Sequence, residues 1–104
     1  MKDPLSSKQC AELLKALADQ DRLRIVQTLR SGPKNVSQIT EELKAELANV
    51  SHHLGILKRS GLVEGEKQGR HVVYSLRADV YQAASRSADH LDLGCCRLEI
   101  PRNK

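Results

Sequence analysis

Three cysteines carry the most reactive side chains of this 104-residue chain. Cys95 and Cys96 are adjacent near the C-terminus, and Cys10 lies near the N-terminus. Thiolates suit soft, thiophilic ions, and because two neighbouring sulfurs need one more for a three-coordinate site, Cys10 is the candidate third ligand. Cys10 also shares a helical stripe with Leu13 and Leu17, where a cysteine commonly serves as a small apolar residue. Both interpretations of Cys10 stay open at this point.

The redox state of these thiols follows from their number and setting. An odd number of cysteines does not suit a disulfide framework, and the N-terminus lacks the apolar segment of a secretory signal. We therefore expect free thiols in a reducing compartment, the cytoplasm. In one alternative, Cys95 and Cys96 are redox sensors that oxidation or persulfidation switches. In another, His90 and Asp92 join them around zinc, which accepts nitrogen, oxygen and sulfur together.

A second group of functional candidates lies on a helix expected over residues 46–60. One side of this helix is apolar and should pack on the domain: Leu47, Val50, Leu54 and Leu57. The opposite side is small and polar, with no acidic residue after Glu46, which suits entry into a major groove. An asparagine can pair with adenine, a histidine can donate to guanine, and a serine suits a phosphate oxygen. The candidate DNA contacts on this side are Asn49, Ser51, His52 and Arg59.

The adjacent histidines of this helix need separate interpretations. Neighbouring residues diverge by about 100° on a helix, so His52 and His53 form a poor chelate and no metal site is expected there. His52 points outward toward DNA, whereas His53 borders the apolar side and is expected to be a packed, hydrogen-bonded structural residue.

A basic hairpin follows the helix. Residues 62–67 and 72–76 have strand character and flank a glycine turn at Gly69. Lys67, Arg70 and His71 cluster at its tip, where a wing beside a recognition helix would reach the DNA backbone or minor groove.

The remaining elements complete a recognisable layout. Helices are expected over 7–18, 22–30, 38–43 and 78–91, followed by a short irregular tail over 92–104. Ser37 is the expected cap of the third helix and a further candidate DNA contact. The order predicts a mainly α fold with a two-stranded β wing, a winged helix-turn-helix, as one domain over 1–104. The net charge of +4 favours a polyanionic partner, and no apolar run is long enough to span a membrane.

Three motifs resemble a known family. Residues 14–29 (LKALADQDRLRIVQTL) are similar to the opening of the ArsR/SmtB family of metal-responsive repressors. Residues 47–63 (LANVSHHLGILKRSGLV) resemble its recognition helix, and Gly69-Arg70 with residues 73–76 (VYSL) its wing. The resemblance extends over about residues 11–91. It implies a homodimeric repressor, built on its first and last helices, that releases a two-fold symmetric operator when an inducer binds.

The sensing residues depart from the best-known patterns of that family. Its third-helix cysteine pair is replaced here by Asn35 and Ser37, and Tyr81 stands where the last helix of zinc sensors places a histidine. Some arsenic sensors of the family carry a C-terminal cysteine pair, which Cys95-Cys96 resembles. The resemblance thus implies arsenite or a similar ion as inducer, with Cys10 from either subunit completing the site.

A cysteine-dependent enzyme is not expected. The two C-terminal cysteines are adjacent rather than spaced as C-x-x-C, and no glycine-rich anion loop precedes them. The sequence therefore predicts a DNA-binding repressor controlled at its cysteines, with no catalytic residues.

Overall fold

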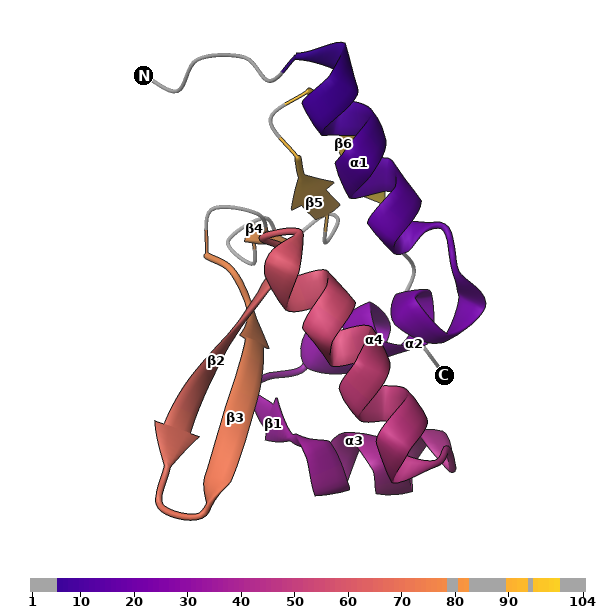
Figure 1. The fold of residues 1–104 in the computed structure, drawn as a ribbon. Helices are drawn as coiled ribbons and strands as arrows, with labels where there is room; N and C mark the ends of the chain where they lie inside the picture. Colours follow the sequence, from indigo (N-terminus) through magenta and orange to yellow (C-terminus); the bar gives the residue numbers. More distant parts are fainter. Residues whose placement is uncertain (1–5, 79–80, 83–89, 94, 100–104) are drawn as a thin grey trace.

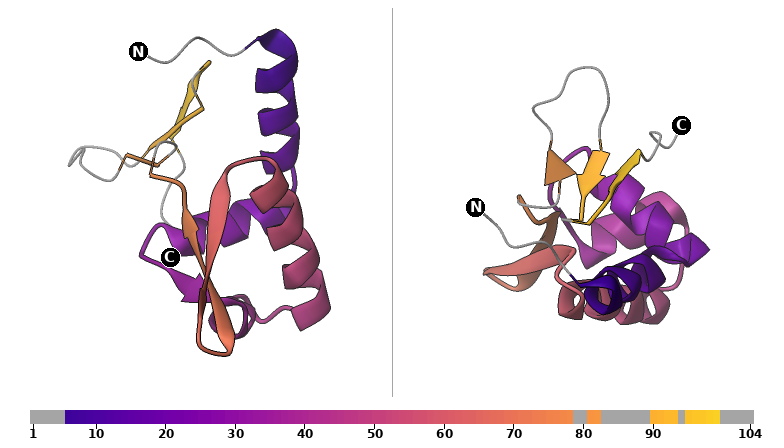
Figure 2. Two further views of the ribbon diagram at one scale, coloured as in Figure 1. Left: turned by 60° about the vertical axis from the view of Figure 1, so that its left-hand side comes forward. Right: turned by 90° about the horizontal axis from the view of Figure 1, so that it is seen from above.

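The computed structural model describes residues 6–78, 81–82, 90–93 and 95–99, and Figure 1 shows their arrangement. Four helices stand beside a twisted hairpin, and a small second sheet lies next to the first helix (Figures 1 and 2). The elements in chain order are α1 (Ser7–Leu17), α2 (Gln20–Leu29), β1 (Lys34–Asn35), α3 (Val36–Leu43), α4 (Leu47–Arg59), β2 (Val63–Gln68), β3 (His71–Leu76), β4 (Tyr81–Gln82), β5 (His90–Asp92) and β6 (Arg97–Glu99). This is the predicted winged helix-turn-helix.

Local capping signals set where the first two helices begin. The side chain of Ser6 accepts a hydrogen bond from the backbone N–H of Gln9, whose side chain accepts one from Ser6, as in a capping box. The carboxylate of Asp19 accepts hydrogen bonds from the backbone N–H groups of Asp21 and Arg22 at the start of α2. These backbone bonds, that of Arg22 foremost, hold the pKa of Asp19 below its usual value.

The predicted cap of the third helix was wrong. Asn35, not Ser37, caps α3: its side chain accepts a hydrogen bond from the backbone N–H of Gln38 at 2.8 Å, and the Gln38 side chain accepts one from the backbone N–H of Asn35. Three residues after Ser37 comes Thr40, whose hydroxyl is already bonded to the carbonyl of Val36. Only Asn35 has a partner three residues later that can reach back, so the helix begins two residues earlier than predicted.

The wing is a three-stranded sheet in the order β1-β3-β2, one strand more than predicted. Gln68 pairs with His71, which leaves Gly69 and Arg70 as a two-residue turn. Gly69 has a φ of 63°, a conformation that a residue without a Cβ adopts at no steric cost. In Figure 1 the hairpin stands to one side of the helices, and its turn lies at the end of the wing that points away from the second sheet.

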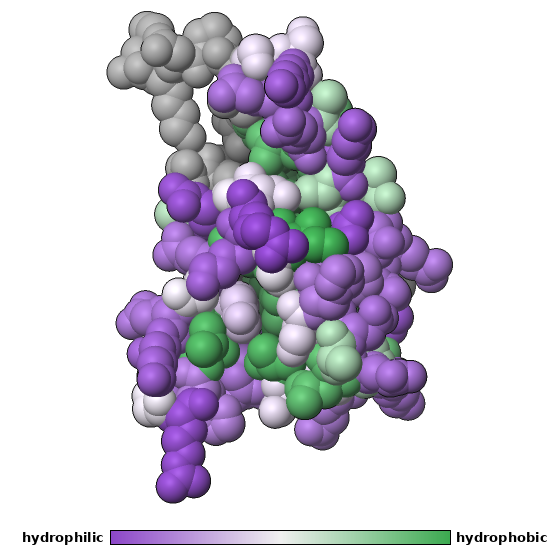
Figure 3. Space-filling view, in the orientation of Figure 1, coloured by the Kyte–Doolittle hydropathy of each residue, from purple (hydrophilic) through white to green (hydrophobic). Residues whose placement is uncertain are grey.

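An aliphatic core joins the helices to the sheet. Its most deeply buried residues come from α2, α3, α4, the start of the wing and β5: Ile25, Val26, Ile39, Leu54, Leu57, Leu62, Val63 and Leu91. The visible surface is mainly hydrophilic, with an apolar strip between the wing and α4 (Figure 3). Among the helices that the structure describes, none has the length and hydrophobicity required to cross a bilayer.

The predicted last helix over 78–91 was also wrong where the structure describes it. Tyr81 and Gln82 pair with Leu91 and His90 in antiparallel strands, and β5 pairs in turn with β6, inside the predicted irregular tail. The helical stripe over 78–91 rests largely on alanines and serines, which bury little apolar area. Leu91 and Leu93 alternate as a strand requires, and both are buried. The rest of the predicted helix, 79–80 and 83–89, lies outside the described residues.

Candidate DNA-binding surface and thiol cluster

Helix α4 presents one face to the core and another to solvent. Val50, Leu54 and Leu57 are buried as predicted, and His53 is only 8% exposed. Leu47, predicted to be inward, is 55% exposed. It is the first residue of α4, and Ala45 from the preceding turn packs against the core instead. The apolar side of the helix therefore begins at Val50.

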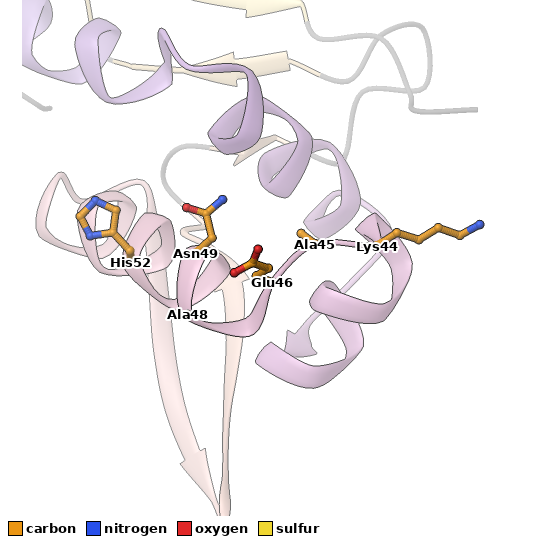
Figure 4. Close-up of a pocket in the computed structure, with 6 residues that line it drawn as sticks. All are labelled: Lys44, Ala45, Glu46, Ala48, Asn49 and His52. Atoms are coloured by element: carbon orange, nitrogen blue, oxygen red, sulfur yellow. The ribbon is translucent and has the colours of Figure 1, made fainter.

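The eight predicted DNA contacts are all exposed, and seven of them lie on α3, on the first turns of α4 and at the wing tip. Asn49 and His52 line an open hollow at the start of α4, together with Lys44, Ala45, Glu46 and Ala48 (Figure 4). Ser51 lies on the same helix, and Ser37 lies in the first turn of α3. Lys67, Arg70 and His71 surround the wing turn.

Arg59 is separated from the other candidates. It lies at the last residue of α4 and lines a hollow with Gln9, Glu12 and Leu13 of α1. The structure therefore places Arg59 beside α1 rather than beside Asn49 and His52.

A polar cluster links α4 to α2. Nη1 of Arg22 is 3.1 Å from Nδ1 of His53, and Nε2 of His53 is 3.7 Å from a carboxylate oxygen of Asp21. The same Asp21 oxygen accepts a hydrogen bond from the Asn49 side chain at 3.5 Å. His53 is thus the packed, hydrogen-bonded residue that the sequence predicted. The partners Asp21 and Arg22 were missed, since they lie some thirty positions away on α2.

A second polar cluster, also missed, joins α2, α3 and β1. The hydroxyl of the buried Thr28 donates a hydrogen bond to Glu42, and Lys34 donates to Thr28 and lies 3.1 Å from the Glu42 carboxylate. The hydrogen bond from Thr28, with a smaller effect of Lys34, holds the pKa of Glu42 below its usual value.

The three cysteines meet at the end of the molecule opposite the wing tip. Cys10 of α1 forms a disulfide with Cys95, just before β6, and their Cα atoms are 6.1 Å apart. Cys96 is free and half-buried, and its sulfur lies 3.9 Å from that of Cys95. All three sulfur atoms lie within 4.8 Å of one another. In Figure 1 the second sheet and α1 adjoin one another above the wing.

The expectation of three free thiols was therefore wrong, because the fold brings Cys10 and Cys95 within disulfide distance inside one chain. Reduction would restore three closely spaced thiols, a donor set that fits a soft three-coordinate ion. The side chains of His90 and Asp92, required by the zinc alternative, lie outside the described residues.

Comparison with known proteins identifies the family. The model of bacterial regulatory proteins of the arsR family matches residues 19–65. The HTH-type transcriptional regulator NmtR of Mycobacterium tuberculosis is 40% identical over 96 residues, which cover 88% of this chain and 80% of that protein. The chain belongs to the ArsR/SmtB family. As a member of this metal-responsive family it is a winged-helix transcriptional regulator and not an enzyme, as the sequence predicted.

Solved structures of similar proteins show the same fold. The homodimeric winged helix-turn-helix DNA-binding domain of Mb0332 from Mycobacterium bovis has a TM-score of 0.64 and 35% identity, over 66% of this chain and 64% of that one. Reduced HlyU from Vibrio cholerae has a TM-score of 0.64 and 34% identity, over 67% of this chain and 74% of that one.

The ArsR family model matches only part of the chain. Residues 19–65 run from the cap of α2 through the recognition helix to the middle of β2. Cys10, Cys95 and Cys96 all lie outside it. The family model therefore covers the helix-turn-helix, stops before the wing turn and leaves out the cysteines, so it carries no information about the ligands of an inducer.

Proposed function

We propose that this protein represses transcription by binding operator DNA, and that arsenite or a similar thiophilic ion releases it by binding Cys10, Cys95 and Cys96. The observation that carries the proposal is the approach of three sulfur atoms to within 4.8 Å of one another. Three thiolates at one point match the three-coordinate preference of trivalent arsenic.

The binding step requires the reduced protein. A dithiol or phosphine reductant first supplies two electrons to the Cys10–Cys95 disulfide and yields two thiols. Arsenous acid then exchanges its three hydroxyl groups for the sulfur atoms of three thiols, and each thiol proton leaves with a hydroxyl group as water, so three water molecules are released with no change in oxidation state. The proposed site is closed within one chain, because Cys10 and Cys95 of the same chain are already in contact.

The DNA-binding surface combines the recognition helix and the wing. We assign base contacts to Asn49 and His52, which share one hollow at the start of α4, and a phosphate contact to Ser51. Lys67, Arg70 and His71 at the wing tip supply flanking backbone contacts, and Ser37 in the first turn of α3 adds a further one. Arg59, which lines a hollow with α1, is left out of this surface. Homodimerisation, supported by the homodimeric Mb0332 domain, would place two such surfaces on a two-fold symmetric operator. We retain the prediction of one domain acting in the cytoplasm.

Fluorescence anisotropy tests the proposal directly. The full chain, reduced with a phosphine that does not sequester arsenite, is titrated onto duplex DNA from upstream of its own gene, with and without arsenite. We expect salt-dependent, sequence-specific binding that arsenite weakens in the wild type. Cys10→Ser, Cys95→Ser and Cys96→Ser should bind DNA but respond weakly to arsenite, and Ser60→Ala is the matched control.

Two outcomes would refute separate parts of the proposal. Reduced protein that binds specifically but ignores arsenite would remove the assigned inducer and leave the repressor. Equal affinity for the upstream duplex and for unrelated DNA would remove the repressor as well.

The Cys10–Cys95 disulfide supports a second candidate, in which oxidation itself is the signal. Here a two-electron oxidant of the peroxide class converts the two thiols to the disulfide and is itself reduced to water. This candidate predicts a difference in DNA affinity between oxidised and reduced protein without any metal, and Cys96→Ser should keep that difference. Equal affinities of the two forms would exclude it.

A further inference from the structure

Leu47 is a large hydrophobic side chain exposed at the start of α4, the recognition helix. Among the described residues, two large hydrophobic side chains are classed as exposed, Leu14 at 39% and Leu47 at 55%. Leu14 lies on α1, near the thiol cluster, whereas Leu47 is the first residue of α4. Exposing a leucine side chain to water is unfavourable, so the exposure of Leu47 at the start of the candidate recognition helix needs a reason.

The position of Leu47 is that of a base-contacting residue. In helix-turn-helix proteins, residues at the N-terminal end of the recognition helix reach the base edges. Ser51 follows Leu47 by one turn on the same side of α4, and Asn49 lies at the adjacent hollow. The beginning of α4 lies next to α3 and away from α1 and the second sheet (Figures 1 and 2). Leu47 therefore extends the candidate DNA-binding surface.

The neighbours of Leu47 restrict what it can contact in DNA. Glu46 is exposed and its side chain makes no capping hydrogen bond, so a carboxylate stands beside Leu47. A carboxylate repels phosphates but can accept a hydrogen bond from the amino group of a base. A base edge is thus favoured over the backbone at this point, and the major groove offers a leucine one apolar group, the C5-methyl of thymine.

We propose that Leu47 reads the C5-methyl group of a thymine in the major groove of the operator. This contact rests on the proposed repressor function and adds a determinant of its sequence specificity. Through this contact Leu47 would favour A·T pairs, on a surface that the sequence predicted to be polar.

Replacing thymine by deoxyuridine tests the contact without changing base pairing. The upstream duplex is first footprinted, and each thymine inside the footprint is then replaced in turn by deoxyuridine, which lacks only the methyl group. Anisotropy is measured for wild type, for Leu47→Ala and for the matched control Leu14→Ala. We expect one sensitive thymine per half-site, where wild type and Leu14→Ala lose about fourfold in affinity, as burial of a single carbon group implies. Leu47→Ala should lose nothing further at that position.

The possible results distinguish failure of the methyl contact from failure of the proposed repressor function. Specific binding with no sensitive thymine, or with equal sensitivity in Leu47→Ala, overturns the methyl contact and leaves the repressor. Binding without sequence preference overturns the repressor and this contact together. An altered oligomeric state of Leu47→Ala, with unaltered thymine sensitivity, would assign Leu47 to a protein interface instead.

Discussion

Loss of the Cys10–Cys95 disulfide should destabilise the fold strongly, because the bond closes a very long loop. The two cysteines are 85 residues apart in sequence, so the disulfide constrains most of the unfolded chain. The chain-entropy relation for a loop of that length gives about 4.5 kcal/mol at room temperature, and native disulfides commonly contribute about 2–4 kcal/mol. For a protein of this size with a urea m-value of about 1.5 kcal/mol/M, the unfolding midpoint should fall by about 1.5–3 M.

Urea unfolding followed by far-ultraviolet circular dichroism measures this effect at one fixed protein concentration. Cys10→Ser should be destabilised to the level of the reduced wild type, and a reductant should not change it further. Cys96→Ser is the matched control, since it removes a half-buried free thiol next to the disulfide and leaves the bond intact. The reasoning is refuted if Cys10→Ser unfolds within about 0.5 kcal/mol of the oxidised wild type, or if Cys96→Ser is equally destabilised.

Three further substitutions test other parts of the structure. Arg22→Met should lower the free energy of unfolding by about 3 kcal/mol, because a charged donor is lost and buried His53 loses a hydrogen-bond partner. A decrease in unfolding free energy of less than about 0.5 kcal/mol, measured by urea unfolding, would contradict this. Thr28 holds the pKa of Glu42 low in the folded state, so the stabilisation by Glu42 is complete above the usual glutamate pKa and lost as the pH falls through the lowered value. The difference in unfolding free energy between wild type and Glu42→Gln should therefore shrink between about pH 7 and about pH 3, and a constant difference would contradict it. Arg70→Ala should weaken DNA binding at every sequence and reduce the slope of log affinity against log salt by about one per protomer, whereas an unchanged slope would remove the wing-tip contact.

Local signals explain what could be predicted from the sequence. The Ser6–Gln9 capping box, the turn at Gly69 and the buried side of α4 each depend on residues within one or two turns of one another. His53 could be assigned a structural role because its angular position on the helix borders the apolar side. Side-chain periodicity and short capping motifs carry this information without any knowledge of the tertiary fold.

The features that could not be predicted depend on contacts between distant residues. Cys10 and Cys95 meet across 85 positions, a contact that no spacing rule reveals. Leu47 has the apolar character of a core residue, but its place at the helix start, where Ala45 already contacts the core, leaves it in solvent. Leu91 fits a helical stripe and a strand equally well, and pairing with β4 and β6 decided between the two.

The position of Arg22 connects the two ends of this regulator. Its Nε donates a hydrogen bond to the carbonyl of Ala16 near the end of α1, and its Nη1 contacts His53 on α4. Cys10 is on the same rigid helix as Ala16, less than two turns earlier, so an ion or a disulfide that shifts α1 also displaces the carbonyl that Arg22 holds. His53 is one turn from Asn49, which lines the candidate DNA surface. A change at the thiols therefore has a short physical route to the placement of α4, which we propose as the path by which an inducer would alter the position of that helix.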